Sequence, residues 1–192
     1  MRLLRRLLMW ILPTRSNWVA YVCDGSPAIP ETAGLQVMAV GPNTALSPEQ
    51  RGFLESRISV LSLTYLLRWH KKGLGWLFFV KSGDDFAHYA FVTPARRYAR
   101  YFPMMNSEEA LLIGPCFTEP EFRGRSIYPR VLQYIVTTLR NEGFGPFYIH
   151  TSIDNKASIR GMEKAGFRQL ARWTGIRAIC GTVVSGHLDL SQ

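Results

Sequence analysis

The apolar positions of this chain fall into short runs and helical stripes, and the clearest succession lies near its middle. Residues 111–117 have the length and bulk of a buried strand, and Gly114-Pro115 inside them predicts a bend or bulge. A polar turn follows over residues 118–126. Beyond it, apolar residues recur at helical spacing: Ile127, Val131, Leu132, Ile135, Val136 and Leu139. The segment is therefore predicted to be a strand, a turn and a helix in succession.

Other apolar or alternating runs predict further strands, and they cover residues 36–40, 76–80, 86–92, 147–151, 168–173 and 176–184. Residues 36–40 are expected to be the first strand of the sheet. The turn residues 81–85 join two of these runs into a predicted hairpin. Residues 18–23 are a short apolar stretch that two prolines and a glycine separate from the next run.

Two more helices are predicted from their end signals. Ser47-Pro48-Glu49-Gln50 has serine as N-cap, proline at the first helical position and glutamine three residues after the cap, so a helix starts there. It is expected to run toward His70 and to end at Gly73, with these residues on its inner face: Leu54, Ile58, Leu61 and Tyr65. A second helix from Asn155 is expected to end at Gly166.

Residues 1–12 are predicted to form an amphipathic basic helix, which Pro13 ends. One face carries aliphatic residues, and the opposite face carries Arg2, Arg5 and Arg6. The apolar run at residues 7–12 is too short to span a bilayer. Two alternatives stay open: peripheral contact with an anionic membrane surface through residues 1–12, or an arm packed on its own domain or on a partner subunit, as in a homodimer.

The amino-acid composition limits the number of domains and the kinds of binding partner that can be expected. The chain has 192 residues, of which 47% are hydrophobic, so one domain over residues 14–192 is expected after the N-terminal segment 1–13. The formal net charge of +9 favours anionic partners such as a nucleotide cofactor, nucleic acid or an anionic membrane. Cys23, Cys116 and Cys180 include no close pair, so neither a disulfide framework nor a metal site is expected. A reduced, cytoplasmic setting fits this cysteine usage.

The turn that precedes the central helix is basic. Such a turn presents unpaired backbone N–H groups and the positive end of the helix dipole to one spot, and Arg123, Arg125 and Arg130 add full charges. A di- or triphosphate group is therefore the expected occupant. The alternative is a solvated basic turn that caps an ordinary helix.

Two stretches together resemble the GCN5-related N-acetyltransferase (GNAT) superfamily. Arg123-Gly124-Arg125-Ser126-Ile127-Tyr128 stands where the family has its Arg/Gln-x-x-Gly-x-Gly/Ala turn for the coenzyme A pyrophosphate, and residues 155–167 match the family's Asn-x-x-Ala/Ser helix that ends in Lys-x-Gly-Phe. The resemblance covers residues 75–175 and implies an α/β (α+β) fold. Its central sheet would be mixed, mostly antiparallel, flanked by helices and splayed at the cofactor site. The residues in these two stretches are most similar to those of family members linked to bacterial polysaccharide and amino-sugar biosynthesis.

The resemblance also implies the residues that bind the cofactor, acetyl-CoA or a related acyl-CoA. They are Cys116, Phe117, Thr118, Arg123, Gly124, Arg125, Ser126, Ile127, Tyr128, Asn155 and Ser158. Ser126 and Tyr128 depart from the small residues that the family has in the turn. Met162 stands where many members carry a tyrosine that protonates the departing thiolate, and methionine has no proton to donate.

Acyl transfer from a thioester to an amine needs a group that accepts the amine proton. His88 in the hairpin and His150 at the end of a later strand are of the type that titrates near the working pH, so both are candidate bases. Each could instead be a satisfied core residue. Glu119 and Glu121 flank the turn and are expected to face solvent.

The sequence thus predicts a cytoplasmic N-acyltransferase, peripheral at the membrane in one alternative, that acts on a small primary amine such as an amino sugar or a nucleotide-linked amino sugar. A non-catalytic acyl-CoA-binding or sensing module is the first alternative, because the family tyrosine is missing. A basic nucleic-acid-binding domain is the second, since basic and aromatic residues interleave over residues 94–103. No recognised reading motif supports the second alternative, so nucleic acid is not the expected partner.

Overall fold

The computed structural model describes residues 14–25, 27, 34–100, 102–178, 181–184 and 189–190. The helix predicted over residues 1–13 and the thiol of Cys180 lie outside these ranges. Among the helices that are described, none combines the length and the hydropathy that a membrane crossing requires.

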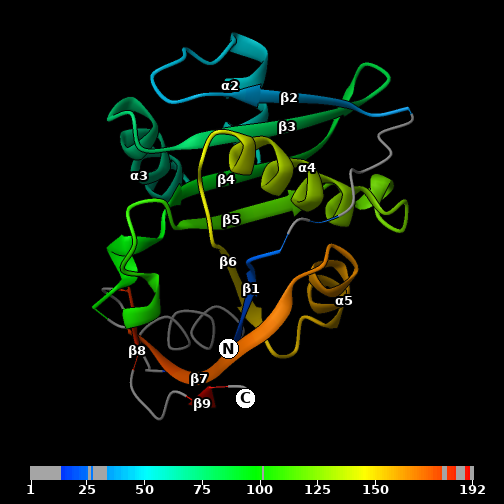
Figure 1. Ribbon diagram of the computed structural model, residues 1–192. Coiled ribbons are helices and arrows are strands. Elements are labelled where there is room, and N and C mark those ends of the chain that lie inside the picture. The colour runs from blue at the N-terminus through cyan, green and yellow to red at the C-terminus, as the bar shows by residue number, and fades with distance from the viewer. Residues whose placement is uncertain are drawn as a thin grey trace, which may run out of the picture.

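The strands form one sheet in the order β2-β3-β4-β5-β6-β1-β7-β8, with β9 paired to β7 (Figure 1). The strands are β1 Thr14–Cys23, β2 Gln36–Val40, β3 Trp76–Ser82, β4 Asp85–Pro94, β5 Leu111–Thr118, β6 Phe147–Ser152, β7 Arg168–Ala178, β8 Gly181–Val184 and β9 Asp189–Leu190. Every described strand pair is antiparallel except β5 with β6. The prediction of a mixed, mostly antiparallel sheet is confirmed.

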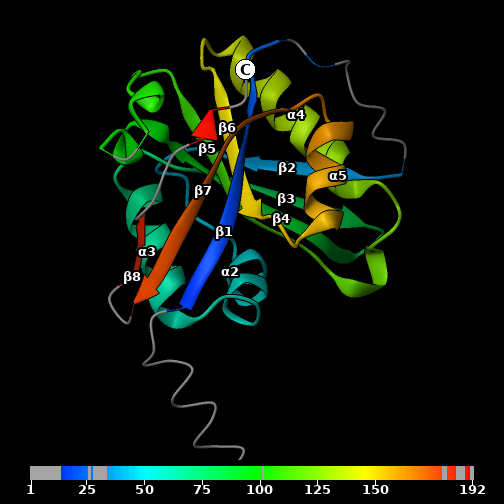
Figure 2. The same ribbon diagram turned by 90° about the horizontal axis from the view of Figure 1, so that it is seen from below.

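The first strand occupies a place that the sequence did not predict. β1 lies between β6 and β7, where Trp18 pairs with Ser152 on one side and with Trp173 on the other. Figure 2 shows β1 and β7 running side by side. The prediction that residues 36–40 are the first strand is wrong, because β2 comes second in the chain and lies at the edge of the sheet, where it pairs with β3.

The helices cover both faces of the sheet. They are α2 Pro48–Glu55, α3 Val60–Lys71, α4 Ile127–Asn141 and α5 Lys156–Lys164, with short 3-10 turns η1 Ala95–Tyr98, η2 Pro103–Met105 and η3 Pro120–Phe122. Along β3, Phe78 and Val80 pack in the core that contains α4 and α5, while Leu77 and Phe79 pack in the core that contains α2 and α3. The alternation of side chains along a strand therefore builds two cores on opposite faces.

The single helix predicted from Ser47 toward His70 is wrong in one respect, because the structure divides it into α2 and α3. The Ser59 side chain accepts a hydrogen bond from the backbone N–H of Ser62 and so begins a new helix. The break rotates the apolar stripe: Leu61 is 85% exposed and Tyr65 is 51% exposed, although both were expected on the inner face. Buried positions of α3 are instead Leu63, Leu66 and His70.

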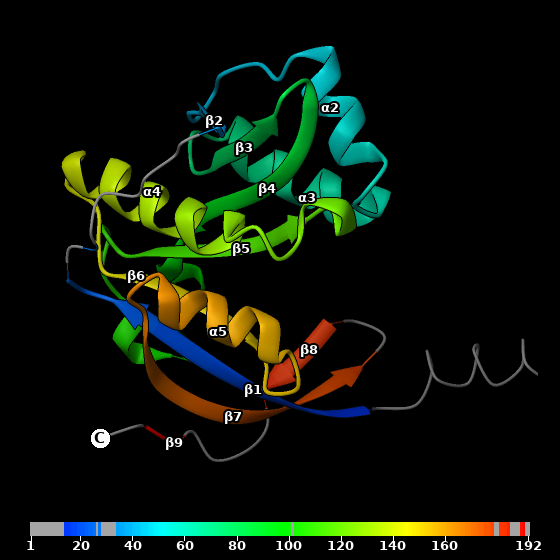
Figure 3. The ribbon, with the colours of Figure 1, turned by 90° about the vertical axis from the view of Figure 1, so that its right-hand side faces the viewer.

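The bulge predicted at Gly114-Pro115 is confirmed. Ala90 pairs with Cys116 and Val92 pairs with Ile113, so two residues of β5 stand opposite the single residue Phe91. The parallel pairing of β5 with β6 ends at Ile113, directly before the bulge. Beyond this point the two strands separate, and the end of β5 lies on the α4 side of the gap while α5 lies on the other (Figure 3).

Candidate active site

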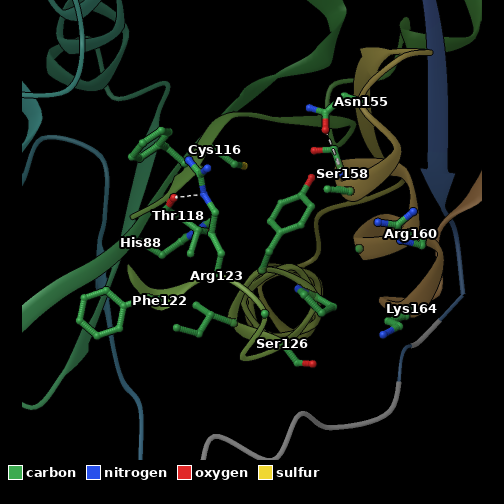
Figure 4. A pocket seen from close by; sticks show the side chains of 17 residues that line it. His88, Cys116, Thr118, Phe122, Arg123, Ser126, Asn155, Ser158, Arg160 and Lys164 are labelled. Atoms are coloured by element: carbon green, nitrogen blue, oxygen red, sulfur yellow. Dashed lines mark hydrogen bonds between the residues drawn. The ribbon is translucent and has the colours of Figure 1, made fainter. Parts of the chain in front are cut away.

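A cavity of about 580 Å³ lies where β5 has separated from β6. One wall carries His88 from β4 with Cys116 and Thr118 from β5, and the other carries side chains of α5, which include Arg160 and Lys164. In Figure 4 the two walls face each other across the open space, with Ser126 of the turn below. The bulge in β5 therefore creates the opening that the cavity fills.

The residues predicted to bind the cofactor gather around this cavity. All of them line it except Arg125, whose guanidinium lies 5.3 Å from the ring centroid of Phe122. Further lining residues that the sequence did not single out are Phe122, Pro129, Ala157, Arg160, Gly161 and Lys164. The chain thus brings together two segments that were predicted separately, residues 116–128 and residues 155–164.

The turn before α4 has a shape that exposes backbone amides. Gly124 has φ +77 and Ser126 has φ 56, which is the left-handed region that a residue with a side chain adopts only at a cost. The Ser126 side chain makes no capping hydrogen bond to α4. Arg123 donates from Nε to the carbonyl oxygen of Thr118 at 3.1 Å and so ties the turn to the end of β5. The first-turn N–H groups of α4 therefore carry no side-chain cap and lie at the cavity.

Two basic residues of α5 were missed as site residues. Arg160 and Lys164 both line the cavity, and a spacing of four residues places them on one face of the helix. The Asn155 side chain caps the same helix by accepting a hydrogen bond from the N–H of Ser158 at 3.1 Å. Two basic residues four positions apart, in the helix that Asn155 caps, were the sequence signal that could have identified Arg160 and Lys164 as site residues. With Arg123, the cavity has three full positive charges on its lining.

His88 is fully buried at the inner end of the cavity. Its Nδ1 lies 2.8 Å from the hydroxyl oxygen of Thr118, and its Nε2 is buried without a hydrogen-bond partner in the described part of the chain. Burial lowers the pKa of His88 to about 3, so the imidazole is neutral at neutral pH. A neutral imidazole that keeps one nitrogen unpaired has a free site for a polar group of a ligand.

His150 does not line the cavity. It is exposed on β6, and its ring centroid lies 5.6 Å from that of Trp18 and 5.9 Å from that of Trp173. It alternates with Ile149, which packs in the core beside α4 and α5, and therefore points to the opposite face of the sheet. Of the two histidines, the structure brings only His88 to the cavity.

The expectation that Glu119 faces solvent is wrong. Its backbone N–H donates to the carbonyl oxygen of Ala87 at 3.0 Å, which continues the pairing of β4 with β5 for one more residue. The side chain is 5% exposed and accepts a hydrogen bond from Nε of Arg57, which comes from the break between α2 and α3. The ion pair thus joins that break to the end of β5.

Tyr128 reaches the cavity, as predicted, whereas Met162, at the position of the family tyrosine, does not. Met162 is fully buried in the core and does not line the cavity. Tyr128 lines it, with its ring against Gly161. The ring centroids of Tyr128 and His88 are 5.9 Å apart. A large side chain on α4 therefore fills the space that a glycine leaves on α5.

The interleaved basic and aromatic residues at 94–103 are packed onto the protein. The Arg97 guanidinium lies 4.6 Å from the ring centroid of Tyr98, 5.5 Å from that of Trp69 and 5.7 Å from that of Tyr65. Phe102 is buried. These rings are occupied by Arg97 and by the core, so they are not presented as a stacking platform. Among the described residues, no three His, Cys, Asp or Glu side chains gather where they could hold a metal ion.

Comparison with known protein families identifies the family of this chain. Residues 55–167, more than half of the chain, match the model of the acetyltransferase (GNAT) family. A comparison with curated protein sequences finds no significant match.

Several solved structures share the fold. A putative GNAT-family acetyltransferase from Novosphingobium aromaticivorans is 17% identical over 93% of this chain and 66% of its own, with a TM-score of 0.56. A GNAT-family acetyltransferase from Colwellia psychrerythraea is 15% identical over 100% of this chain and 62% of its own, with a TM-score of 0.61. The present chain therefore spans less than two thirds of the length of these relatives.

A third structure is similar in length to the matched region. AAC(6')-Iy, solved in complex with the bisubstrate analogue CoA-S-monomethyl-acetylneamine, is 13% identical over 70% of this chain and 90% of its own, with a TM-score of 0.52. At such identities the structures establish the fold, and the sequence match establishes the family. The chain belongs to the acetyltransferase (GNAT) family.

Proposed function

We propose that this protein transfers an acetyl group, or a related acyl group, from acyl-CoA to a small primary amine. The observation that carries the proposal is the cavity at the gap between β5 and β6, which has the uncapped start of α4 and three cations on its lining. An anionic, extended co-substrate with a thioester at one end fits this arrangement, because its phosphates would meet the helix N-terminus and its acyl end would reach the buried wall.

Phosphate binding is assigned to the turn and to α5. The N–H groups from Gly124 to Tyr128 would donate to the pyrophosphate, and Arg123 would add its charge from the same side. Arg160 and Lys164 face them from α5 and suit a second phosphate group. The pantetheine arm would then lie along Cys116 to Thr118, where pairing with β6 has ended.

The reaction forms a C–N bond and breaks the C–S bond of the thioester. His88 is the proposed base, because it lines the cavity and its buried Nε2 has no hydrogen-bond partner among the described residues. Burial makes His88 a weak base, so it takes the proton after the amine has begun to bond to the carbonyl carbon, when that nitrogen is far more acidic than a free ammonium. His150, on the other face of the sheet, has no such position.

The test combines calorimetry with a thiol-release assay. Titration with acetyl-CoA should show saturable binding, and a panel of primary amines that includes amino sugars and aminoglycosides should contain at least one that releases CoA. Folded wild-type protein that binds no acetyl-CoA would overturn the proposal. Binding without thiol release from any amine would favour the acyl-CoA-binding module instead.

A pair of charge-matched variants tests the phosphate assignment. Arg160→Gln/Lys164→Gln should weaken acetyl-CoA binding by about tenfold or more, since each charged contact to a phosphate is worth about 1 kcal/mol at a partly exposed site. Arg68→Gln/Lys72→Gln removes the same charge from the last turn and the C-cap of α3, whose residues do not line the cavity, and should leave the affinity within about twofold. Equal weakening by both variants would mean that only the net charge matters.

A further inference from the structure

Tyr128 brings a large aromatic ring into the cavity from the first turn of α4. The ring is in direct contact with α5, because a Cβ built on Gly161 would lie 2.4 Å from its Cδ1 atom. On β4, the ring of His88 has its centroid 5.9 Å from that of Tyr128. The Tyr128 ring therefore spans the space between α5 and the buried wall of the cavity.

The cavity changes character from its rim to its inner end. The three cations on its lining, Arg123, Arg160 and Lys164, are exposed. At the inner end His88 and Phe122 are buried, and burial keeps the imidazole of His88 neutral at neutral pH by lowering its pKa to about 3. The rim suits phosphates, whereas the inner end suits an apolar group, which is the acyl end of the co-substrate under the proposed function.

We propose that the ring of Tyr128 limits the length of the acyl group, so that acetyl and propionyl groups fit the inner end and hexanoyl and longer chains do not. This inference rests on the proposed function and adds to it the class of acyl donor. The role in specificity depends on the bulk of the ring and not on its hydroxyl.

The packing around the ring gives the physical reason. A longer chain that extends along the buried wall would meet the ring, which has Gly161 on one side and His88 on the other. Forcing extra methylenes into a filled interior is unfavourable. Gly161 has no side chain, so removal of the ring would open the cavity as far as the backbone of α5. One side chain thus determines the depth of the cavity.

The other bulky side chains that line the cavity are less able to set this limit. Phe122 and Ile127 belong to the buried core on the α4 and α5 side of the sheet, and Phe117 packs against the core on the opposite face. Tyr128 is partly buried and packs against the first of these cores. Truncation of Tyr128 therefore enlarges the cavity without removing a member of either core.

Calorimetric titration of the full chain with acetyl-CoA, butyryl-CoA and hexanoyl-CoA tests the limit without an acceptor amine. For the wild type, the affinity should fall by about tenfold or more from acetyl-CoA to hexanoyl-CoA, because the longer chain overpacks the inner end. Tyr128→Ala should reverse this order, since each methylene buried in the opened space is worth about fourfold in affinity. With an amine that supports turnover, kcat/KM should follow the same order.

Tyr128→Phe is the matched control, because it keeps the ring and removes only the hydroxyl. Its ratio of hexanoyl-CoA to acetyl-CoA affinity should stay within about twofold of the wild-type ratio. Tyr134→Ala makes the same truncation on α4 at a residue that does not line the cavity, and it should also keep the ratio. Tyr128→Ala/Gly161→Ala regains helix stability through the second alanine and should show the same reversal as Tyr128→Ala.

Two results would overturn the assignment of Tyr128 and leave the proposed function intact. One is equal affinity of the wild type for acetyl-CoA and hexanoyl-CoA. The other is an unchanged affinity ratio in both variants that carry Tyr128→Ala. Folded wild-type protein that binds no acyl-CoA of any length would overturn the proposed function as well.

Discussion

Replacing Gly161 by alanine should change the stability of the protein in two opposite ways: alanine favours the helix, and its methyl group clashes with Tyr128. An ideal Cβ at Gly161 would lie 2.4 Å from Cδ1 of Tyr128 and 2.8 Å from its Cε1, closer than any two carbon atoms pack. The ring has little room to swing away, because it is packed against Gly161 and its centroid lies 5.9 Å from that of the buried His88 ring. The added methyl group therefore has to displace either the ring or α5.

The sizes of these two effects determine whether Gly161→Ala stabilises or destabilises the protein. Alanine is favoured over glycine inside a helix by about 1 kcal/mol, whereas overpacking a filled interior costs about 1–3 kcal/mol. The net expectation for Gly161→Ala is a loss of about 1 kcal/mol of unfolding free energy. In a Tyr128→Ala background the clash is absent, so the same substitution should stabilise by about 1 kcal/mol. The coupling between the two sites is then about 2 kcal/mol, which is typical of side chains in contact.

Urea unfolding of the wild type, both single variants and the double variant measures this coupling. Gly52→Ala is the matched control, since Gly52 lies in α2 and a Cβ there meets nothing within 4 Å. That control should show only the gain from helix propensity. If Gly161→Ala stabilises the wild type as much as Gly52→Ala does, the contact with Tyr128 is not the constraint described above.

Three further predictions concern stability. Burial lowers the pKa of His88 to about 3 from an ordinary 6.5, so the unfolded state binds more protons between these pH values. The free energy of unfolding should therefore fall by up to about 1.4 kcal/mol for each unit by which the pH is lowered. His88→Gln should flatten this slope in unfolding curves recorded across the range, and an unchanged slope would contradict the burial of a neutral His88. Ser126→Gly should gain about 1 kcal/mol in urea unfolding by relieving the left-handed backbone, whereas Ser126→Ala should gain nothing. Arg57→Met leaves the buried carboxylate of Glu119 without its cation and should lower the free energy of unfolding. Arg168→Met breaks a pair that is exposed on both sides and should lower it less, so equal losses would show that burial of Glu119 is unimportant.

Local signals in the sequence were sufficient for the parts of the fold that neighbouring residues determine. The bulge at Gly114, the start of α4 and the capped helix at Asn155 each depend on residues within a few positions, and each is present in the structure. The break between α2 and α3 also had a local signal at Ser59, but the continuous apolar spacing through Ile58 and Leu61 concealed it.

The remaining features depend on contacts between distant segments. His88 and His150 both stand in apolar strands, and only the packing of the helices determines which face of the sheet each one meets. Glu119 is buried because Arg57 reaches it from another segment of the chain. Tyr128 departs from the small residue of the family turn, and its match with Gly161 becomes evident only when α4 and α5 are side by side. The hydrophobic pattern of a single helix or strand cannot predict contacts of this kind between distant segments.

The position of β1 has a consequence for biosynthesis. Trp18 pairs with Ser152 and Trp173, so the ribosome makes β1 well before either of its neighbours. Until β7 has been made, the apolar residues of β1 have at least one unpaired edge, which is a template for pairing with other chains. Contacts so distant in sequence also slow folding, because the intervening loop must close first. This half of the sheet is thus completed late, and a nascent chain arrested before residue 168 leaves one edge of β1 unpaired.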